Sequence, residues 1–174
     1  MNSKIILSNV LRFVLILLVQ VFILKRIWLE VDGRPSFQVL AYPLFLMILP
    51  SKMPRIALML LGFLLGILID LFYTPMGLHA GALVLLAYTR PWILSFLAPR
   101  DGYNMNHSPT MKRMGRNWFL KYSASLLLLH TFFYFSLEAF TFAYIYEILW
   151  QTFTSFAISF IFIIIFMLVF NPED

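Results

Sequence analysis

The sequence predicts an all-α integral membrane protein with six transmembrane helices, organised as a single polytopic domain over residues 1–174. Of the residues, 61% are hydrophobic and 12% are charged, whereas a soluble domain is about 45–50% apolar and about 25% charged. The apolar residues form continuous runs, which argues against transmembrane strands because those alternate over about ten residues. Six helices of about 20 residues each leave no room for a soluble catalytic domain.

Six apolar runs are the candidate spans. They cover residues 10–27, 39–49, 56–72, 78–97, 122–142 and 149–170. The first run contains Arg12 and Gln20 and carries Lys25 and Arg26 at its end instead of a small-residue cleavage site. We therefore expect a retained helix there and not a signal peptide.

The second run, 39–49, is the weakest candidate. Even when it is extended back to Ser36 it covers only about 20 Å of a hydrocarbon core of about 30 Å, and it contains Pro43. It is either a short crossing helix buried among its neighbours or a re-entrant or interfacial piece. The second choice gives an alternative arrangement with five spans.

Basic residues in the short loops indicate the orientation. With six spans and a cytoplasmic N-terminus, eight basic residues lie inside, namely Lys4, Lys52, Arg55, Arg100, Lys112, Arg113, Arg116 and Lys121, and three lie outside, namely Lys25, Arg26 and Arg34. Five spans with an external N-terminus place ten inside and one outside, so the sequence leaves both arrangements open. Both predict a cytoplasmic C-terminus.

The longest connection, residues 98–121, is predicted to be a cytoplasmic loop because it is rich in Pro, Gly and Asn. It holds five basic residues and one acid, Asp101. Such a loop fixes orientation and attracts anionic lipid headgroups. Recognition by a cytoplasmic protein is the alternative.

Polar residues near the third and fourth runs form the first candidate site. Gly62, Gly66 and Asp70 repeat every four residues, so they share a helix face on which another helix can approach closely. A helix that simply ends at Asp70 is the alternative. Gly77 and Gly81 follow, with His79 between them, and we expect a tight hairpin in which His79 either bonds Asp70 or lies in headgroup water.

A second candidate site lies in the fifth run, where His130, Tyr134 and Glu138 again follow a four-residue spacing. The sixth run adds a polar stripe of Gln151, Thr152, Thr154, Ser155 and Ser159. These side chains either line a polar cavity or hydrogen-bond between helices. Arg90, next to Pro91 in the fourth run, is expected to snorkel to the membrane surface.

The sequence lacks the common motifs of catalytic, metal-binding and nucleotide-binding sites. It has no cysteine and three widely spaced histidines, and it lacks the HExxH, GxSxG and Walker patterns. We expect no catalytic, cofactor-binding or metal-binding residues. The net charge of +5 does not indicate nucleic-acid binding, because the basic residues stand at the ends of apolar runs.

The stretch GFLLGILIDLFYTPMGLHAGALVLLAYTRP, residues 62–91, resembles the rod shape-determining membrane proteins of the MreD family. The shared features are a glycine-spaced helix that ends in Asp, a short turn, and GLHA opening the next helix. RDGYN at 100–104 and LEAFTF at 137–142 are similar to the version found in the Bacteroidetes group.

This resemblance implies a non-enzymatic scaffold subunit of the cell-elongation complex (elongasome) in the bacterial inner membrane. Such proteins bind MreC and through it link MreB filaments to RodA and a penicillin-binding transpeptidase, and so to peptidoglycan synthesis, the cell wall and cell shape.

The family is also similar in fold to the S components of energy-coupling-factor transporters, which implies an S-component-like bundle and favours six spans. The alternative function is therefore a small-molecule-binding S component of a vitamin transporter. Such a subunit should carry an Ala-rich docking motif, but the first run contains no alanine.

Overall fold

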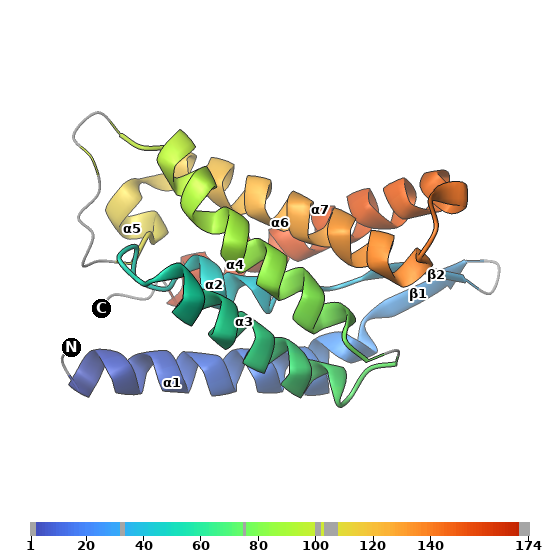
Figure 1. Cartoon of the computed structure of the whole chain (residues 1–174), viewed down its shortest axis with the longest axis horizontal. Helices are drawn as coiled ribbons and strands as arrows, with labels where there is room; N and C mark the ends of the chain where they lie inside the picture. Colours follow the sequence, from blue (N-terminus) through green and yellow to red (C-terminus); the bar gives the residue numbers. More distant parts are fainter. Residues whose placement is uncertain (1–2, 32–33, 75, 100–101, 103–107, 171–174) are drawn as a thin grey trace.

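The computed structural model describes residues 3–31, 34–74, 76–99, 102 and 108–170 (Figure 1). Its long helices are α1 (Ser3–Leu18), α3 (Arg55–Asp70), α4 (Leu78–Phe96), α6 (Arg116–Ala139) and α7 (Ile145–Phe170). The shorter elements are η1 (Val19–Ile23), η2 (Leu24–Arg26), β1 (Trp28–Val31), β2 (Arg34–Gln38), α2 (Pro43–Met47), α5 (Met111–Met114) and η3 (Phe142–Tyr144). The predicted all-α class is confirmed, with one β-hairpin added.

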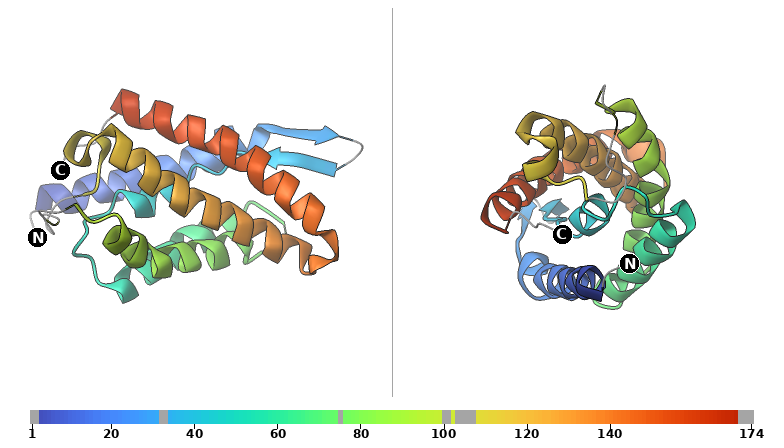
Figure 2. Two further views of the ribbon diagram at one scale, coloured as in Figure 1. Left: turned by 90° about the horizontal axis from the view of Figure 1, so that it is seen from above. Right: turned by 90° about the vertical axis from the view of Figure 1, so that its left-hand side faces the viewer.

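The long helices run roughly along the long axis of the molecule and surround α2 (Figures 1 and 2). Neighbouring helices in the sequence pack together, α3 on α4, α4 on α6, and α6 on α7. Both chain ends lie at one end of the bundle, and the hairpin of β1 and β2 projects from the other (Figure 1). We call these the terminal end and the hairpin end.

The β-hairpin was not expected from the sequence analysis. β1 pairs with β2 in an antiparallel register, with Trp28 opposite Gln38 and Val31 opposite Arg34. The sequence does carry a signal for it, because Asp32-Gly33 is a strong hairpin dipeptide between two strand-like runs.

The expectation of a transmembrane helix at residues 39–49 is wrong. Only the five residues Pro43–Met47 are helical, because Pro43 lacks an N–H and the helix begins with it. Every residue of 39–49 is nonetheless buried. We call residues 38–49 the central segment, since they run from the hairpin into the middle of the bundle (Figure 2).

The predicted long loop also differs from the structure in its boundaries. It is shorter than 98–121, because α5 occupies Met111–Met114 and α6 already begins at Arg116. Gly115 separates these two helices with a φ of 85°, a backbone conformation that favours glycine. Arg100, Asp101 and residues 103–107, which include most of RDGYN, lie outside the described residues, as does the tail 171–174.

Two helical segments among the described residues are long and apolar enough to cross a membrane. They are Leu7–Arg26, with a mean hydropathy of 2.3, and Ile145–Phe170, with a mean hydropathy of 2.7. Length and composition are weak evidence for a membrane protein, and by this measure six spans are not supported. α3, for example, has 16 residues, or roughly 24 Å of helix.

Candidate functional site: a buried polar centre

A cluster of buried polar and aromatic side chains occupies the half of the bundle nearer the hairpin end. We call it the polar centre. It is formed by Gln20, Gln38, Tyr42, Asp70, Tyr73, His79, His130 and Tyr134. Its members come from η1, the central segment, α3, the α3–α4 turn, α4 and α6, so it joins most of the fold.

The helices α3 and α4 approach closely along two glycines. A Cβ atom on Gly66 would overlap the Cα of Ala80 and lie 2.8 Å from the carbonyl carbon of His79. A Cβ atom on Gly62 would lie 3.1 Å from the carbonyl oxygen of Leu83. Glycine at both positions therefore allows the backbones of α3 and α4 to touch.

Asp70 closes this helix contact at its hairpin end. One carboxylate oxygen accepts hydrogen bonds from the His79 backbone N–H at 3.1 Å and the His79 Nδ1 at 2.7 Å. The other accepts from the Ala80 N–H at 3.1 Å. Asp70 and His79 are 1% and 0% exposed, so the carboxylate binds the free N–H groups at the start of α4 in place of a local cap.

Gly77 and Gly81, the other two glycines of the candidate site, do not belong to this contact. A Cβ atom on Gly77 would meet nothing within 4 Å, and the residue has a φ of 95° at the start of α4. Its role is to turn the backbone. A Cβ atom on Gly81 would face α6, 3.2 Å from Leu137 Cδ1.

The His79 ring is oriented by its bond to Asp70. Because a carboxylate accepts from Nδ1, the neutral ring carries its proton there and presents a bare Nε2. This Nε2 is buried and has no hydrogen-bond partner among the described residues. Around the ring lie Tyr42, Tyr73 and Tyr134, at centroid distances of 5.3, 4.5 and 4.9 Å.

The predicted polar face of α6 binds the central segment. His130 Nε2 lies 2.8 Å from the Tyr42 hydroxyl, and the Tyr134 hydroxyl donates to Gln38 Oε1 at 3.2 Å. His130 and Tyr134 are 0% and 2% exposed, so they make contacts within the chain. Glu138, the third residue of that face, keeps one buried carboxylate oxygen, Oε2, without a hydrogen-bond partner in the described part of the chain.

Gln20 is a residue of this site that the sequence analysis did not single out. Its Nε2 donates to the Val39 carbonyl at 2.9 Å, and its Oε1 accepts from the Ala41 N–H at 3.1 Å. Nε2 also lies 3.2 Å from the Tyr73 hydroxyl. Gln20 belongs to the π-helical η1, and such π-turns inside helices often mark functional positions. A glutamine inside an apolar run is a signal that could have identified it.

Two serines of the polar stripe in α7 also bind the central segment. Ser155 Oγ accepts from the Gln38 N–H at 2.9 Å, and Ser159 Oγ accepts from the Leu40 N–H at 2.8 Å. Non-helical backbone is tolerated in an apolar interior only when its polar groups find such partners. The serines therefore supply hydrogen bonds that a helix would have made by itself.

Arg90 binds the other end of the central segment, and the expectation that it snorkels to the surface is wrong. The side chain is fully buried. Its Nε donates to the Tyr122 hydroxyl at 2.9 Å, and its guanidinium also binds the carbonyls of Met47 and Leu49. A cation is stabilised there by the carbonyl groups that end α2.

The hydrogen bonds from Gln20, His130 and Ser159 hold the central segment in place. No group of three or more His, Cys, Asp or Glu that could hold a metal ion is found among the described residues. Comparison with known proteins adds no relative, since no protein family, no curated protein and no solved structure matches this chain.

Proposed function

We propose that this protein is a non-enzymatic scaffold subunit of the bacterial cell-elongation complex, embedded in the inner membrane with several crossings. Its expected direct partner is MreC, and through MreC it would help to couple MreB filaments to RodA and a penicillin-binding transpeptidase. The proposal starts from the resemblance of residues 62–91 to the MreD family.

The exposed surface supports a place in the bilayer. Large apolar side chains face outward on several helices, such as Leu11 at 61% exposed, Ile56 at 74% and Ile165 at 54%. Only 22% of each of the two most apolar helical windows is buried, whereas a core helix of a soluble protein is mostly buried. Lipid is the environment in which such a surface is stable.

The ends of the bundle support an even number of crossings. Both termini lie at the terminal end (Figure 1). The basic residues of that end include Lys52, Arg55, Lys112, Arg113, Arg116 and Lys121, and those of the hairpin end include Lys25 and Arg26. By the positive-inside rule the terminal end is cytoplasmic. In this proposal the central segment makes the second of six crossings and is sheltered from lipid by the helices around it.

One observation carries the scaffold proposal. Four residues of the MreD-like stretch, Gly62, Gly66, Asp70 and His79, form one packed unit in which two glycines admit α4 and the carboxylate binds its first N–H groups. The resemblance thus rests on residues that hold the fold together. A bundle packed through such backbone and side-chain contacts suits a protein whose ligand is another protein.

The direct test is purification of the tagged protein from native membranes after crosslinking. Recovery of MreC with elongation proteins is the expected result, and a strain lacking MreC is the control for specific capture. Recovery of a pair of ATPases without MreC would contradict the scaffold proposal.

A small-molecule-binding S component of a vitamin transporter is the second candidate, and one observation favours it. The unpartnered Nε2 of His79 is a hydrogen-bond acceptor surrounded by three tyrosine rings, which is the kind of group that orients a small ligand. Capture of an ATPase pair, together with saturable vitamin binding by the purified protein, is the result that this alternative requires.

A further inference from the structure

A cavity lies between the first and last helices of the chain, toward the terminal end. It has a volume of about 240 Å³ and is lined by Leu11, Arg12, Leu15 and Ile16 of α1 and by Phe166 and Phe170 of α7, among others. A smaller space of about 10 Å³ shares Leu15, Ile16 and Phe166 with it and reaches Val19 and Phe162. The two spaces follow α1 and the start of η1 for about three turns.

The cavity is apolar except at one place. Six of its eight lining residues are Leu, Ile or Phe, and Arg12 is the one charged residue among them. Arg12 NH1 donates to Asn9 Oδ1 at 3.2 Å, so the guanidinium extends toward the start of α1. This is the basic, terminal end of the molecule.

We propose that this cavity binds an anionic phospholipid of the cytoplasmic leaflet. The phosphate group contacts Arg12, and one acyl chain lies along α1 and α7 toward Val19 and Phe162. The inference rests on the placement of the chain in a membrane and not on the scaffold role.

The lining favours an acyl chain over a helix of another protein. Helices in membranes approach one another through Gly, Ala, Ser and Thr, whereas large side chains such as Leu15 and Phe166 dominate this cavity. A helix with its side chains is about 10 Å across, so a space of about 240 Å³ cannot admit one. A flexible chain fits an irregular apolar space of this size.

The position of Arg12 favours an anionic headgroup. The residue lies five positions inside the apolar segment Leu7–Arg26, roughly 8 Å along the helix from its start. A charge at this depth reaches toward the headgroups and pairs there. Guanidinium binds phosphate through two parallel hydrogen bonds, and the cytoplasmic leaflet is rich in anionic lipids.

The test compares phosphatidylglycerol with phosphatidylcholine of the same acyl chains, titrated onto the purified protein and followed by native mass spectrometry. Arg12→Gln removes the charge, and Leu15→Trp fills the cavity. Arg55→Gln and Val14→Trp are matched controls, because Arg55 is exposed at the same end and Val14 is 44% exposed beside Leu15, and neither lines the cavity. We expect Arg12→Gln and Leu15→Trp to weaken phosphatidylglycerol binding about tenfold, as loss of a charged hydrogen bond does, and the controls to change it less than twofold.

Equal phosphatidylglycerol binding by Arg12→Gln and the unmodified protein would overturn the proposal. An equal loss in Arg55→Gln would also overturn it, since surface charge would then explain the preference for phosphatidylglycerol.

A second measurement needs no variant. Phosphatidylglycerol with a photoreactive acyl chain should label peptides that contain Leu15 or Phe166. Labelling spread evenly over the exposed helices, or confined to another site, would also contradict it.

Discussion

Arg90 illustrates how a single residue depends on its distant partners. An arginine near the end of an apolar run ordinarily reaches for the membrane surface. Here the carbonyls of Met47 and Leu49 and the hydroxyl of Tyr122 bind the guanidinium inside the bundle. Tyr122 in turn donates to the Met47 carbonyl at 3.0 Å. The four groups fix the end of α2 against α4 and α6.

Replacement of Arg90 should therefore lower stability. Arg90→Met keeps much of the apolar volume but leaves the two carbonyls with fewer donors, and we expect a loss of about 2 kcal/mol, typical of hydrogen bonds to a charged group. Thermal unfolding in detergent measures it. Arg113→Met, at an exposed position, is the control, and equal melting temperatures for the two variants would show that Arg90 does not hold α2.

At the scale of elements, the long helices could be predicted and the central segment could not. The runs 78–97 and 149–170 coincide closely with α4 and α7, because a long apolar run specifies a helix almost alone. The bond between Asp70 and His79 spans nine residues and was accessible to sequence reasoning. The bond between Leu40 and Ser159 spans 119 residues, and only the assembled bundle makes non-helical backbone stable there.

The backbone of the central segment should become less stable when one of its side-chain hydrogen-bond partners is removed. Ser159→Ala leaves the Leu40 N–H without its acceptor in a buried place, which typically costs about 1–3 kcal/mol. Ser125→Ala is the matched control, because Ser125 is exposed and its hydroxyl binds its own helix at Lys121. Hydrogen exchange of the backbone at 38–42 measures the effect, and unchanged protection in Ser159→Ala would contradict it.

Replacing Gly66, which lies in the α3–α4 contact, should cost more stability than replacing Gly81, which faces α6. Gly66→Ala places a methyl group on the backbone of α4, and such overpacking costs about 1–3 kcal/mol. Gly81→Ala meets only the flexible end of Leu137 and should be nearly neutral, helped by the better helix propensity of alanine.

Both glycine variants should insert into the membrane normally, because insertion follows overall hydropathy. Thermal stability and capture of the proposed partner MreC are the two measurements that distinguish the variants. If Gly66→Ala matched Gly81→Ala in both measurements, the two helices would not touch at Gly66.

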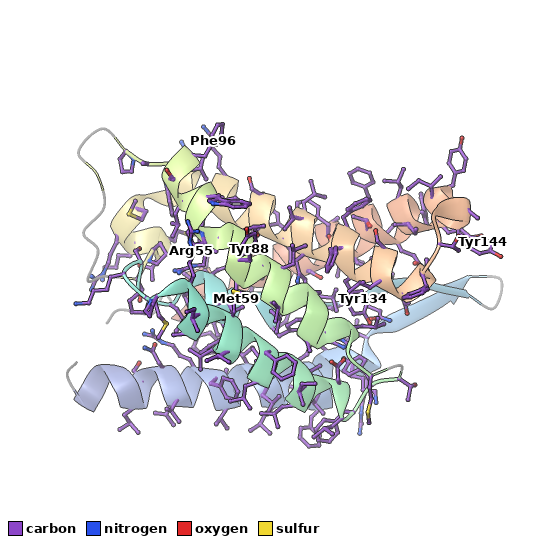
Figure 3. All side chains as sticks on the ribbon, in the orientation of Figure 1. Arg55, Met59, Tyr88, Phe96, Tyr134 and Tyr144 are labelled. Atoms are coloured by element: carbon purple, nitrogen blue, oxygen red, sulfur yellow. The ribbon has the colours of Figure 1, made fainter. Side chains whose placement is uncertain are left out.

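At the scale of the whole molecule, the two ends differ in charge and in shape. Most basic residues of the described chain lie at the terminal end, and the β-hairpin lies at the other; Figure 3 shows the exposed aromatic residues Phe96 and Tyr144 toward these opposite ends. Large apolar side chains are exposed along the long helices, such as Leu15 of α1, Leu64 of α3 and Phe153 of α7. In a bundle that crosses a membrane, as we propose for this chain, the polar groups are turned inward or lie at the ends.

The central claim is that the chain crosses the membrane from a cytoplasmic N-terminus, with the central segment inside the bundle. Because the chain has no cysteine, single cysteines can be labelled without background. Lys25, exposed at the hairpin end, distinguishes the six-span from the five-span arrangement. In cells with a permeabilised outer membrane and an intact inner membrane, Lys25→Cys should react with a membrane-impermeant maleimide. Arg113→Cys should react only after the cells are lysed. Protection of Lys25→Cys until lysis would contradict the claim.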